Sequence, residues 1–167
     1  MGQYSIFMKE IETGFYSFSG KPFPTEKNLV VAVHPFFWHH PFLKNQFDDY
    51  LVKLNNFLRQ RNSPIILMEE HQRVDVLARH LVSLRLENRL IVKTNEGSPT
   101  FSEIPPESFL KYVSDLKGDK PVDLIGGNLY RRGRDIPKWD GCLGIIAKLF
   151  HEEGISFNFL EQLVFGK

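Results

Sequence analysis

The chain of 167 residues contains one cysteine, Cys142, and this scarcity limits its chemistry. A single cysteine forms no intrachain disulfide and excludes a cysteine-rich zinc or iron–sulfur site. No apolar run approaches the roughly 20 residues that a membrane-spanning helix needs. Residues 1–5 also lack the basic and then apolar pattern of a signal peptide. We therefore expect a cytoplasmic protein with no membrane partner.

An excess of charge of one sign is missing as well. The 21 Lys and Arg residues nearly balance the 20 Asp and Glu residues, for a formal net charge of +1. No overall field therefore attracts nucleic acid or anionic lipid, and we expect no nucleic-acid partner. The motifs GxGxxG and GxxxxGK[ST] do not occur, which removes the dinucleotide fingerprint and the P-loop. The sequence identifies no cofactor.

Hydrophobic residues make up 42% and charged residues 25% of the chain, which is ordinary for a globular protein. The length fits one domain, residues 1–167, in which residues 1–27 form a hairpin and linker and residues 28–167 form the core. Short β-branched apolar runs predict strands buried on both faces. These runs are residues 29–33, 65–68, 90–92 and 122–125, and the alternating segment 157–165 predicts a longer strand toward one edge.

Helical patterns separate the predicted strands. Apolar residues recur three or four apart within residues 47–58, 74–84, 109–116 and 143–150. Strands that are joined through helices are parallel, and right-handed crossovers place the helices on both faces of the sheet. We therefore predict an α/β, three-layer Rossmann-like fold with a mainly parallel sheet of about five strands. Residues 4–8 and 15–18 predict an N-terminal β-hairpin at one edge.

Ligands of open α/β sheets bind beyond the carboxyl ends of the strands. The loops expected there are residues 34–40, 69–71, 93–98 and 126–142, and they hold four of the six histidines. His34, His39 and His40, with Glu70 or His71, are of the types that ligate transition metals. The alternative is an aromatic cap in which the histidines are wall residues. No metal ligand is assigned.

The adjacent carboxylates Glu69 and Glu70 allow two interpretations. They could divide acid and base roles between them, or one could face inward while the other caps a helix in solvent. We favour the second interpretation.

Basic and polar residues after the fourth predicted strand favour an anionic ligand. An arginine side chain presents a planar fork that matches phosphate and carboxylate groups, and the flanking glycines let the backbone approach a ligand. The alternative is a solvated basic loop. The predicted ligand-binding residues are Arg131, Arg132, Arg134, Asn128 and Trp38.

Cys142 lies at the predicted start of the fourth helix. Free amide hydrogens and the helix dipole at such a position lower the pKa of a thiol and favour the reactive thiolate. A lone cysteine is also commonly a small buried hydrophobic residue. The position of Cys142 at a helix start favours a nucleophile, but it does not exclude a small buried residue.

Two pairs of segments resemble the isochorismatase-like cysteine hydrolases. They are Leu90-Ile91-Val92-Lys93 with Ser98-Pro99-Thr100-Phe101, and Ile125-Gly126-Gly127 with Gly141-Cys142-Leu143, within a looser likeness over residues 28–165. The resemblance implies that Cys142 is the nucleophile and that Lys93 stabilises its thiolate. Where that family has an acidic residue after the first strand, this chain has Val33-His34-Pro35, and residues 128–140 lengthen the turn before the cysteine. His34 then takes the place of the proton acceptor.

Three functions follow from these patterns. The first is a hydrolase of a small amide, ester or enol ether with the catalytic residues Cys142, Lys93 and His34. The second is a non-catalytic domain that binds an anionic metabolite or a nucleotide phosphate. The third is an assembly module, such as a homodimer, because the 15 phenylalanines exceed ordinary usage and aromatic residues are enriched at interfaces.

Overall fold

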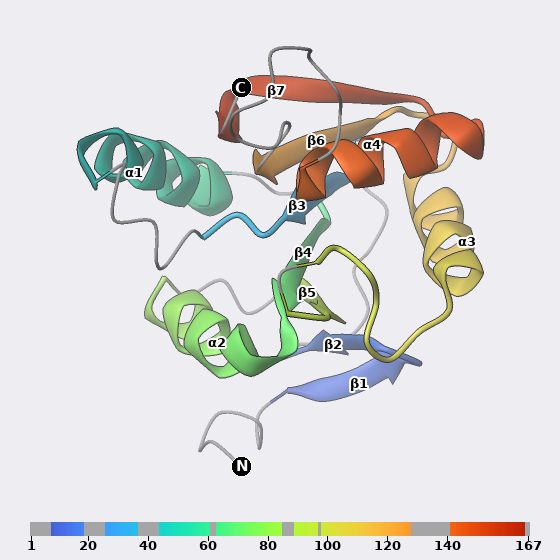
Figure 1. Ribbon diagram of the computed structural model, residues 1–167, viewed down its shortest axis with the longest axis horizontal. Coiled ribbons are helices and arrows are strands. Elements are labelled where there is room, and N and C mark those ends of the chain that lie inside the picture. The colour runs from blue at the N-terminus through green and yellow to red at the C-terminus, as the bar shows by residue number, and fades with distance from the viewer. Residues whose placement is uncertain are drawn as a thin grey trace.

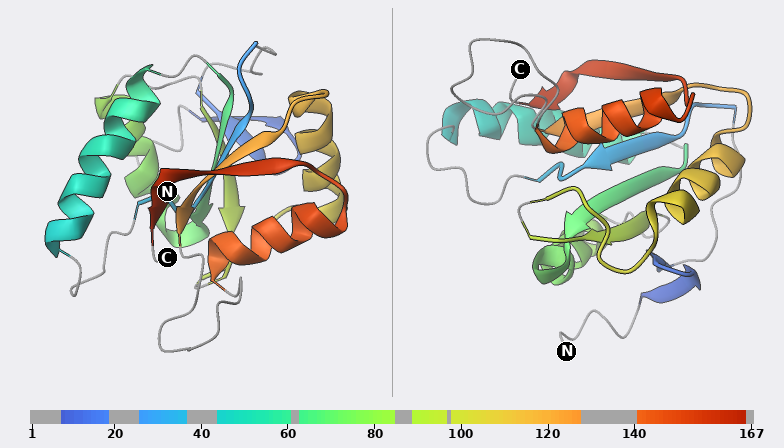
Figure 2. Two further views of the ribbon diagram at one scale, coloured as in Figure 1. Left: turned by 90° about the horizontal axis from the view of Figure 1, so that it is seen from above. Right: turned by 45° about the vertical axis from the view of Figure 1, so that its right-hand side comes forward.

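The structure is a computed structural model, and it describes residues 8–18, 26–36, 44–60, 63–84, 89–96, 98–127 and 141–165. One mixed, seven-stranded sheet lies between two layers of helices (Figures 1 and 2). This arrangement confirms the predicted α/β class with helices on both faces. The described helices include none that is long and apolar enough to cross a membrane.

Strands and helices alternate along the chain after an N-terminal hairpin. The elements are β1 (Lys9–Glu12), β2 (Phe15–Ser17), β3 (Val30–Val33), α1 (Lys44–Gln60), β4 (Ile65–Glu70), the short 3-10 helix η2 (His71–Arg73), α2 (Val74–Ser83), β5 (Leu90–Thr94), α3 (Pro106–Lys117), β6 (Val122–Gly127), α4 (Cys142–Glu152) and β7 (Phe157–Phe165).

The strand order is β1-β2-β5-β4-β3-β6-β7. Strands β3 to β7 pair in parallel, whereas β1 and β2 form an antiparallel hairpin whose second strand pairs with β5. The sheet has seven strands rather than about five because the hairpin, which was expected at one edge, pairs with β5 and extends the main sheet: Phe15 pairs with Val92 and Tyr16 with Ile91. β7 lies at the opposite edge, where the sequence placed it.

Side chains of each strand alternate between two hydrophobic clusters, one on each face of the sheet. Val31 and Val33 pack with α3 and α4 on one face, and Val30 and Ala32 pack with α1 and α2 on the other. Figure 2 shows these two helix pairs on opposite sides of the sheet.

Three strands run further than the apolar runs that predicted them. The observed strands end at Glu70, Thr94 and Gly127, so residues expected in loops are the last residues of strands. Their side chains therefore follow strand alternation. Thr94 shares the face of Leu90 and Val92, and Lys93 shares the face of Ile91.

Candidate functional site

The crossovers change sides between β3 and β6. The chain leaves β3 toward α1 on one face and leaves β6 toward α4 on the other, although these two strands are neighbours in the sheet. Such a switch point opens a crevice at the carboxyl ends of the two strands, where α/β proteins bind ligands. This edge is the candidate functional site.

The backbone is unusual on both sides of the switch point. His34, directly after β3, has φ 42°, which makes it the one non-glycine residue of the described chain in the left-handed region. Gly126 on β6 has φ 106°, and a Cβ atom there would lie 2.1 Å from the carbonyl oxygen of Val33. β6 therefore needs glycine where it faces β3. Distortions of this kind persist where the surrounding structure enforces them, commonly at functional sites.

The His34 ring is buried and is tied to a distant strand. Its Nε2 atom lies 2.8 Å from Oγ1 of Thr94 on β5, and its backbone N–H donates to the carbonyl oxygen of Met68 at 3.0 Å. Because β4 lies between β3 and β5, the ring spans the end of β4.

Burial sets the charge of this imidazole. It lowers the pKa of His34 to about 4, with Glu70 opposing and Arg73 reinforcing the shift. Since an exposed histidine titrates near 6.5, His34 is neutral at neutral pH.

Glu70 is the last residue of β4. Its Oε2 atom accepts a hydrogen bond from Nε2 of Gln72 at 2.8 Å and lies 3.9 Å from Nε of Arg73. Glu69 accepts a hydrogen bond from the backbone N–H of Glu70 at 2.9 Å. Both carboxyl groups are buried, so the expectation that one of them is solvated is wrong. The reason is that β4 continues through both residues and η2 folds back over the second.

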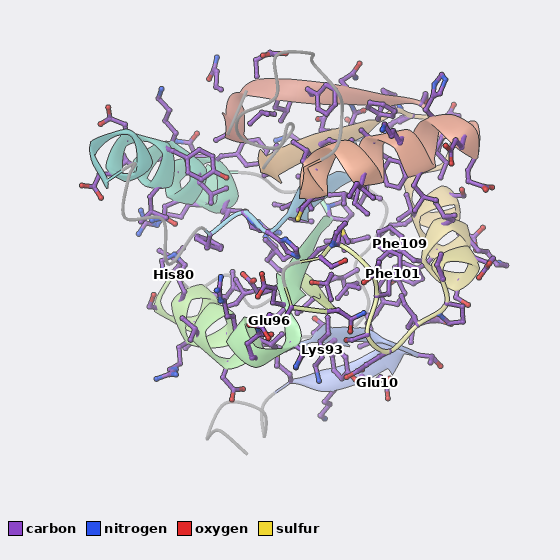
Figure 3. All side chains as sticks on the ribbon, viewed as in Figure 1. Glu10, His80, Lys93, Glu96, Phe101 and Phe109 are labelled. Atoms are coloured by element: carbon purple, nitrogen blue, oxygen red, sulfur yellow. The ribbon has the colours of Figure 1, made fainter. Side chains whose placement is uncertain are left out.

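Lys93 does not join His34. Its Nζ atom lies 3.0 Å from Oε1 of Glu103 and 4.5 Å from the centre of the Tyr16 ring, and the Tyr16 hydroxyl donates to the same carboxylate. Figure 3 shows Lys93 on the side of the hairpin, whereas Phe101 and Phe109 lie toward α3. Burial by itself raises the pKa of Glu103, but the hydrogen bonds from Tyr16 and Lys93 hold it below its usual value. This cluster ties the hairpin to the segment before α3.

Cys142 is the first residue of α4, as predicted, and it is half-buried against the hydrophobic cluster of the α3–α4 face. α4 connects β6 to the parallel strand β7, so its N-terminus lies at the carboxyl edge of the sheet. The N-cap residue is Gly141, and within the described chain no side chain caps the helix and no acidic residue lies in its first turn. The amide groups of the first turn of α4, and the positive end of its dipole, therefore lie at this edge.

The structure thus places two of the predicted catalytic residues, His34 and Cys142, at one edge of the sheet, and Thr94 lies there with them. His34, Thr94 and Cys142 lie at the carboxyl edge, with Thr94 and Cys142 both assigned to the α3–α4 face, whereas Lys93 belongs to the other face. Thr94 was not predicted from the sequence. Extending the strand alternation one residue beyond Lys93 would have indicated its position.

The remaining predicted residues lie outside the described residues. These are Trp38, Asn128, Arg131, Arg132 and Arg134, together with His39 and His40 of the histidine cluster. Among the residues that the structure describes, no group of three or more metal-ligating side chains is present. Phe36 of the expected aromatic cap is buried, and its ring centre lies 4.8 Å from that of His80 in an edge-on contact.

Comparison of the chain with protein-family models, curated proteins and solved structures found no match. The relationship to isochorismatase-like hydrolases therefore stays a prediction.

Proposed function

We propose that this chain is a cysteine-dependent hydrolase of the isochorismatase-like type, with a Rossmann-like arrangement of its parallel strands. Cys142 is the nucleophile and His34 is its proton acceptor. The observation that supports the proposal is that His34, after β3, and Cys142, the first residue of α4, both lie at the carboxyl edge of the sheet. The strand order β5-β4-β3-β6-β7 supports it, because a switch point such as that between β3 and β6 is where α/β proteins commonly bind ligands.

For an amide or ester the proposed steps balance as follows. His34 takes the thiol proton, the sulfur of Cys142 attacks the carbonyl carbon, and the amide groups that begin α4 stabilise the oxyanion. The carbonyl re-forms as the bond to the leaving group breaks, and the leaving group takes the proton from His34. Water then hydrolyses the thioester and restores the thiol. A nucleophilic thiol needs a reducing compartment, which is why we propose a cytoplasmic location.

Lys93 has no chemical step in this proposal. The resemblance implies that it stabilises the thiolate, but Glu103 and Tyr16 hold its ammonium group on the other face of the sheet. We assign it to the attachment of the hairpin instead.

The test is the rate of alkylation of the native protein by iodoacetamide as a function of pH. Since Cys142 is the sole cysteine, the label reports one site, and Cys142→Ser gives the blank. We expect a thiol pKa below the ~8.5 of free cysteine, and slower alkylation at pH 7 in His34→Asn, because asparagine tolerates the left-handed backbone and lacks the imidazole base. A thiol that resists labelling, or one with a pKa at or above ~8.5, overturns the proposal.

A second function is favoured by the backbone at the same edge. Gly126 brings β6 and β3 close together without a side chain, and the N-terminus of α4 lies at the same edge, an arrangement that suits a phosphate or carboxylate. In this alternative the chain binds an anionic metabolite or nucleotide without turnover, using Arg131, Arg132 and Arg134. Thermal denaturation with inorganic phosphate and with nucleotides tests it: a saturating ligand raises the melting temperature, and a triple alanine variant of these arginines abolishes the rise.

A homodimer would use the second edge of the sheet. β1 presents exposed Lys9, Glu10 and Glu12, charges of the kind that discourage pairing at an edge strand. The nine-residue β7 is therefore the edge that we propose for self-association. Light scattering that gives a monomer at high concentration removes this role.

A further inference from the structure

We infer that the groove between α3 and α4 is a binding site for a small organic cation, a primary alkylammonium ion. The two helices lie side by side on one face of the sheet (Figures 1 and 2), and the groove is a cavity of about 310 Å³. That volume is at the lower end of the range for small-molecule pockets. The groove lies at the end of α4 remote from Cys142, ~16 Å along the helix axis, so the inference is independent of the proposed function.

Part of the groove lining is apolar. Leu110 on α3 and Ile155 after α4 are 8% and 5% exposed, and Leu149 on α4 is partly buried against the same hydrophobic cluster. Ile155 reaches the groove because the chain turns after α4: Gly154 has φ 72°, and the backbone N–H of Ile155 donates to the carbonyl oxygen of Phe150 at 2.8 Å. The hydrocarbon chain of a ligand would be removed from water against these side chains.

The charged part of the lining is mainly acidic. It consists of Glu107 on α3, Glu153 after α4, and Lys111 on α3. The Lys111 ammonium group donates to Oδ2 of Asp115 at 2.8 Å, so its charge is already matched outside the groove. Among the residues that the structure describes, neither Glu107 nor Glu153 has an ion-pair or hydrogen-bond partner for its carboxylate. The groove therefore has a negative charge that a cationic ligand would neutralise.

The position of Glu153 is unfavourable without such a ligand. Glu153 is the C-cap residue of α4, where the helix dipole is negative and a positive side chain would be stabilising. The preceding Glu152 adds a second carboxylate at the same helix end. Glu107, by contrast, lies in the first turn of α3, where the dipole favours an acidic side chain. A cation bound beside Glu153 removes the conflict, so the ammonium group of the ligand belongs on that side of the groove.

A primary alkylammonium ion matches both parts of the lining. Its chain covers the apolar side chains, and its nitrogen donates charge-assisted hydrogen bonds to a carboxylate. An alcohol of the same length lacks the charge, and an inorganic ammonium ion lacks the chain. Each part of the match is therefore tested by a simple compound.

The test is a titration of the isotope-labelled protein with n-hexylamine at pH 7, followed by the NMR shifts of its amide groups. We expect saturable shifts at Leu110, Leu149 and Ile155. 1-Hexanol and ammonium chloride should bind these positions about fivefold more weakly or less tightly still. Nα-acetyl-lysine methylamide, which presents the ammonium group of a partner protein's lysine, should also bind more weakly than n-hexylamine. Tighter binding of this compound would overturn the assignment to a small ligand.

Two neighbouring variants locate the ammonium group. We expect Glu153→Gln to weaken the binding of n-hexylamine by about three- to fivefold, the size expected for an exposed ion pair. Glu152→Gln removes the same charge from the same helix end but from a residue outside the lining, and it should change the affinity by less than about twofold. Equal losses in the two variants, equal binding of 1-hexanol, or the absence of saturable shifts overturns the inference. Cys142→Ser should bind n-hexylamine as the wild type does, whatever its effect on turnover.

Discussion

A Cβ atom on Gly126 would lie 2.1 Å from the carbonyl oxygen of Val33, its partner in the β3–β6 register. A backbone atom cannot move aside as a flexible side chain can, and the φ of 106° adds strain for any other residue. We expect Gly126→Ala to lower the free energy of unfolding by roughly 3 kcal/mol or more, measured by urea denaturation. Gly154→Ala is the matched control, since φ is 72° there and nothing lies within 4 Å of the added atom. It should cost only about 1 kcal/mol, and equal losses would contradict the clash.

Acid should destabilise the protein through His34. Its pKa is about 4 when folded, against 6.5 for the free side chain, so the unfolded chain binds the proton first as the pH falls. Stability is therefore constant above about pH 6.5 and falls by up to about 3 kcal/mol as the pH drops to about 4.

Urea denaturation of wild type and His34→Asn between pH 7 and 4 checks this slope. The variant should lose most of it and keep the smaller part that comes from His80, whose pKa is also lowered by burial and by Arg59. The contribution of Glu103 is lost only below the usual carboxyl pKa of 4.5, outside most of this range. If His34→Asn leaves the slope unchanged, folding does not lower the pKa of His34.

Removing the Lys93 ammonium group should weaken the attachment of the hairpin and leave the reactivity of the Cys142 thiol unchanged. Lys93 and Glu103 are 26% and 35% exposed, so we expect Lys93→Met to cost about 1 kcal/mol or less. The alkylation rate of Cys142 should stay within about twofold of wild type. Lys111→Met, which breaks the exposed ion pair with Asp115 on α3, controls for the loss of one positive charge. A tenfold slower alkylation in Lys93→Met alone would restore the role that the family resemblance implies.

The Cys142→Ser variant should fold with little loss of stability. The side chain is half-buried at the first residue of α4, so a serine hydroxyl keeps access to water and to the first turn, and we expect a cost of about 1 kcal/mol or less. Any turnover should disappear. The neighbouring Leu143→Ala, at a fully buried position, should cost about 2–5 kcal/mol in the same urea titration. A comparable loss in Cys142→Ser would identify Cys142 as a core residue.

Local periodicity was sufficient to predict the layers of this protein. The alternation of apolar residues predicted the last strand with the bounds that the structure shows, 157–165, and the helical spacing after Gly141 placed Cys142 at the start of α4. Both signals arise from the periods of strands and helices, which act between residues only a few positions apart.

The same reasoning failed at the ends of the strands. Lys93 was predicted in the loop after the third strand, but β5 continues through Thr94, and strand alternation directs Lys93 and Thr94 to opposite faces. Polar residues interrupt the apolar pattern there, and only pairing with β4, at Glu69 and Glu70, extends the strand.

By itself, the sequence determined the α/β layers, the parallel strands and the edge of the sheet that carries polar side chains, because these depend on periodicity and on the direction of the chain. Tertiary structure alone decided that the hairpin joins β5, that Lys93 meets Glu103 and Tyr16, and that His34 reaches Thr94. These contacts connect residues far apart in the sequence, and they are selected by strand order, register and burial. Pairing of β5 with β4, and of β4 with β3, is what sets the Thr94 hydroxyl beside the His34 ring.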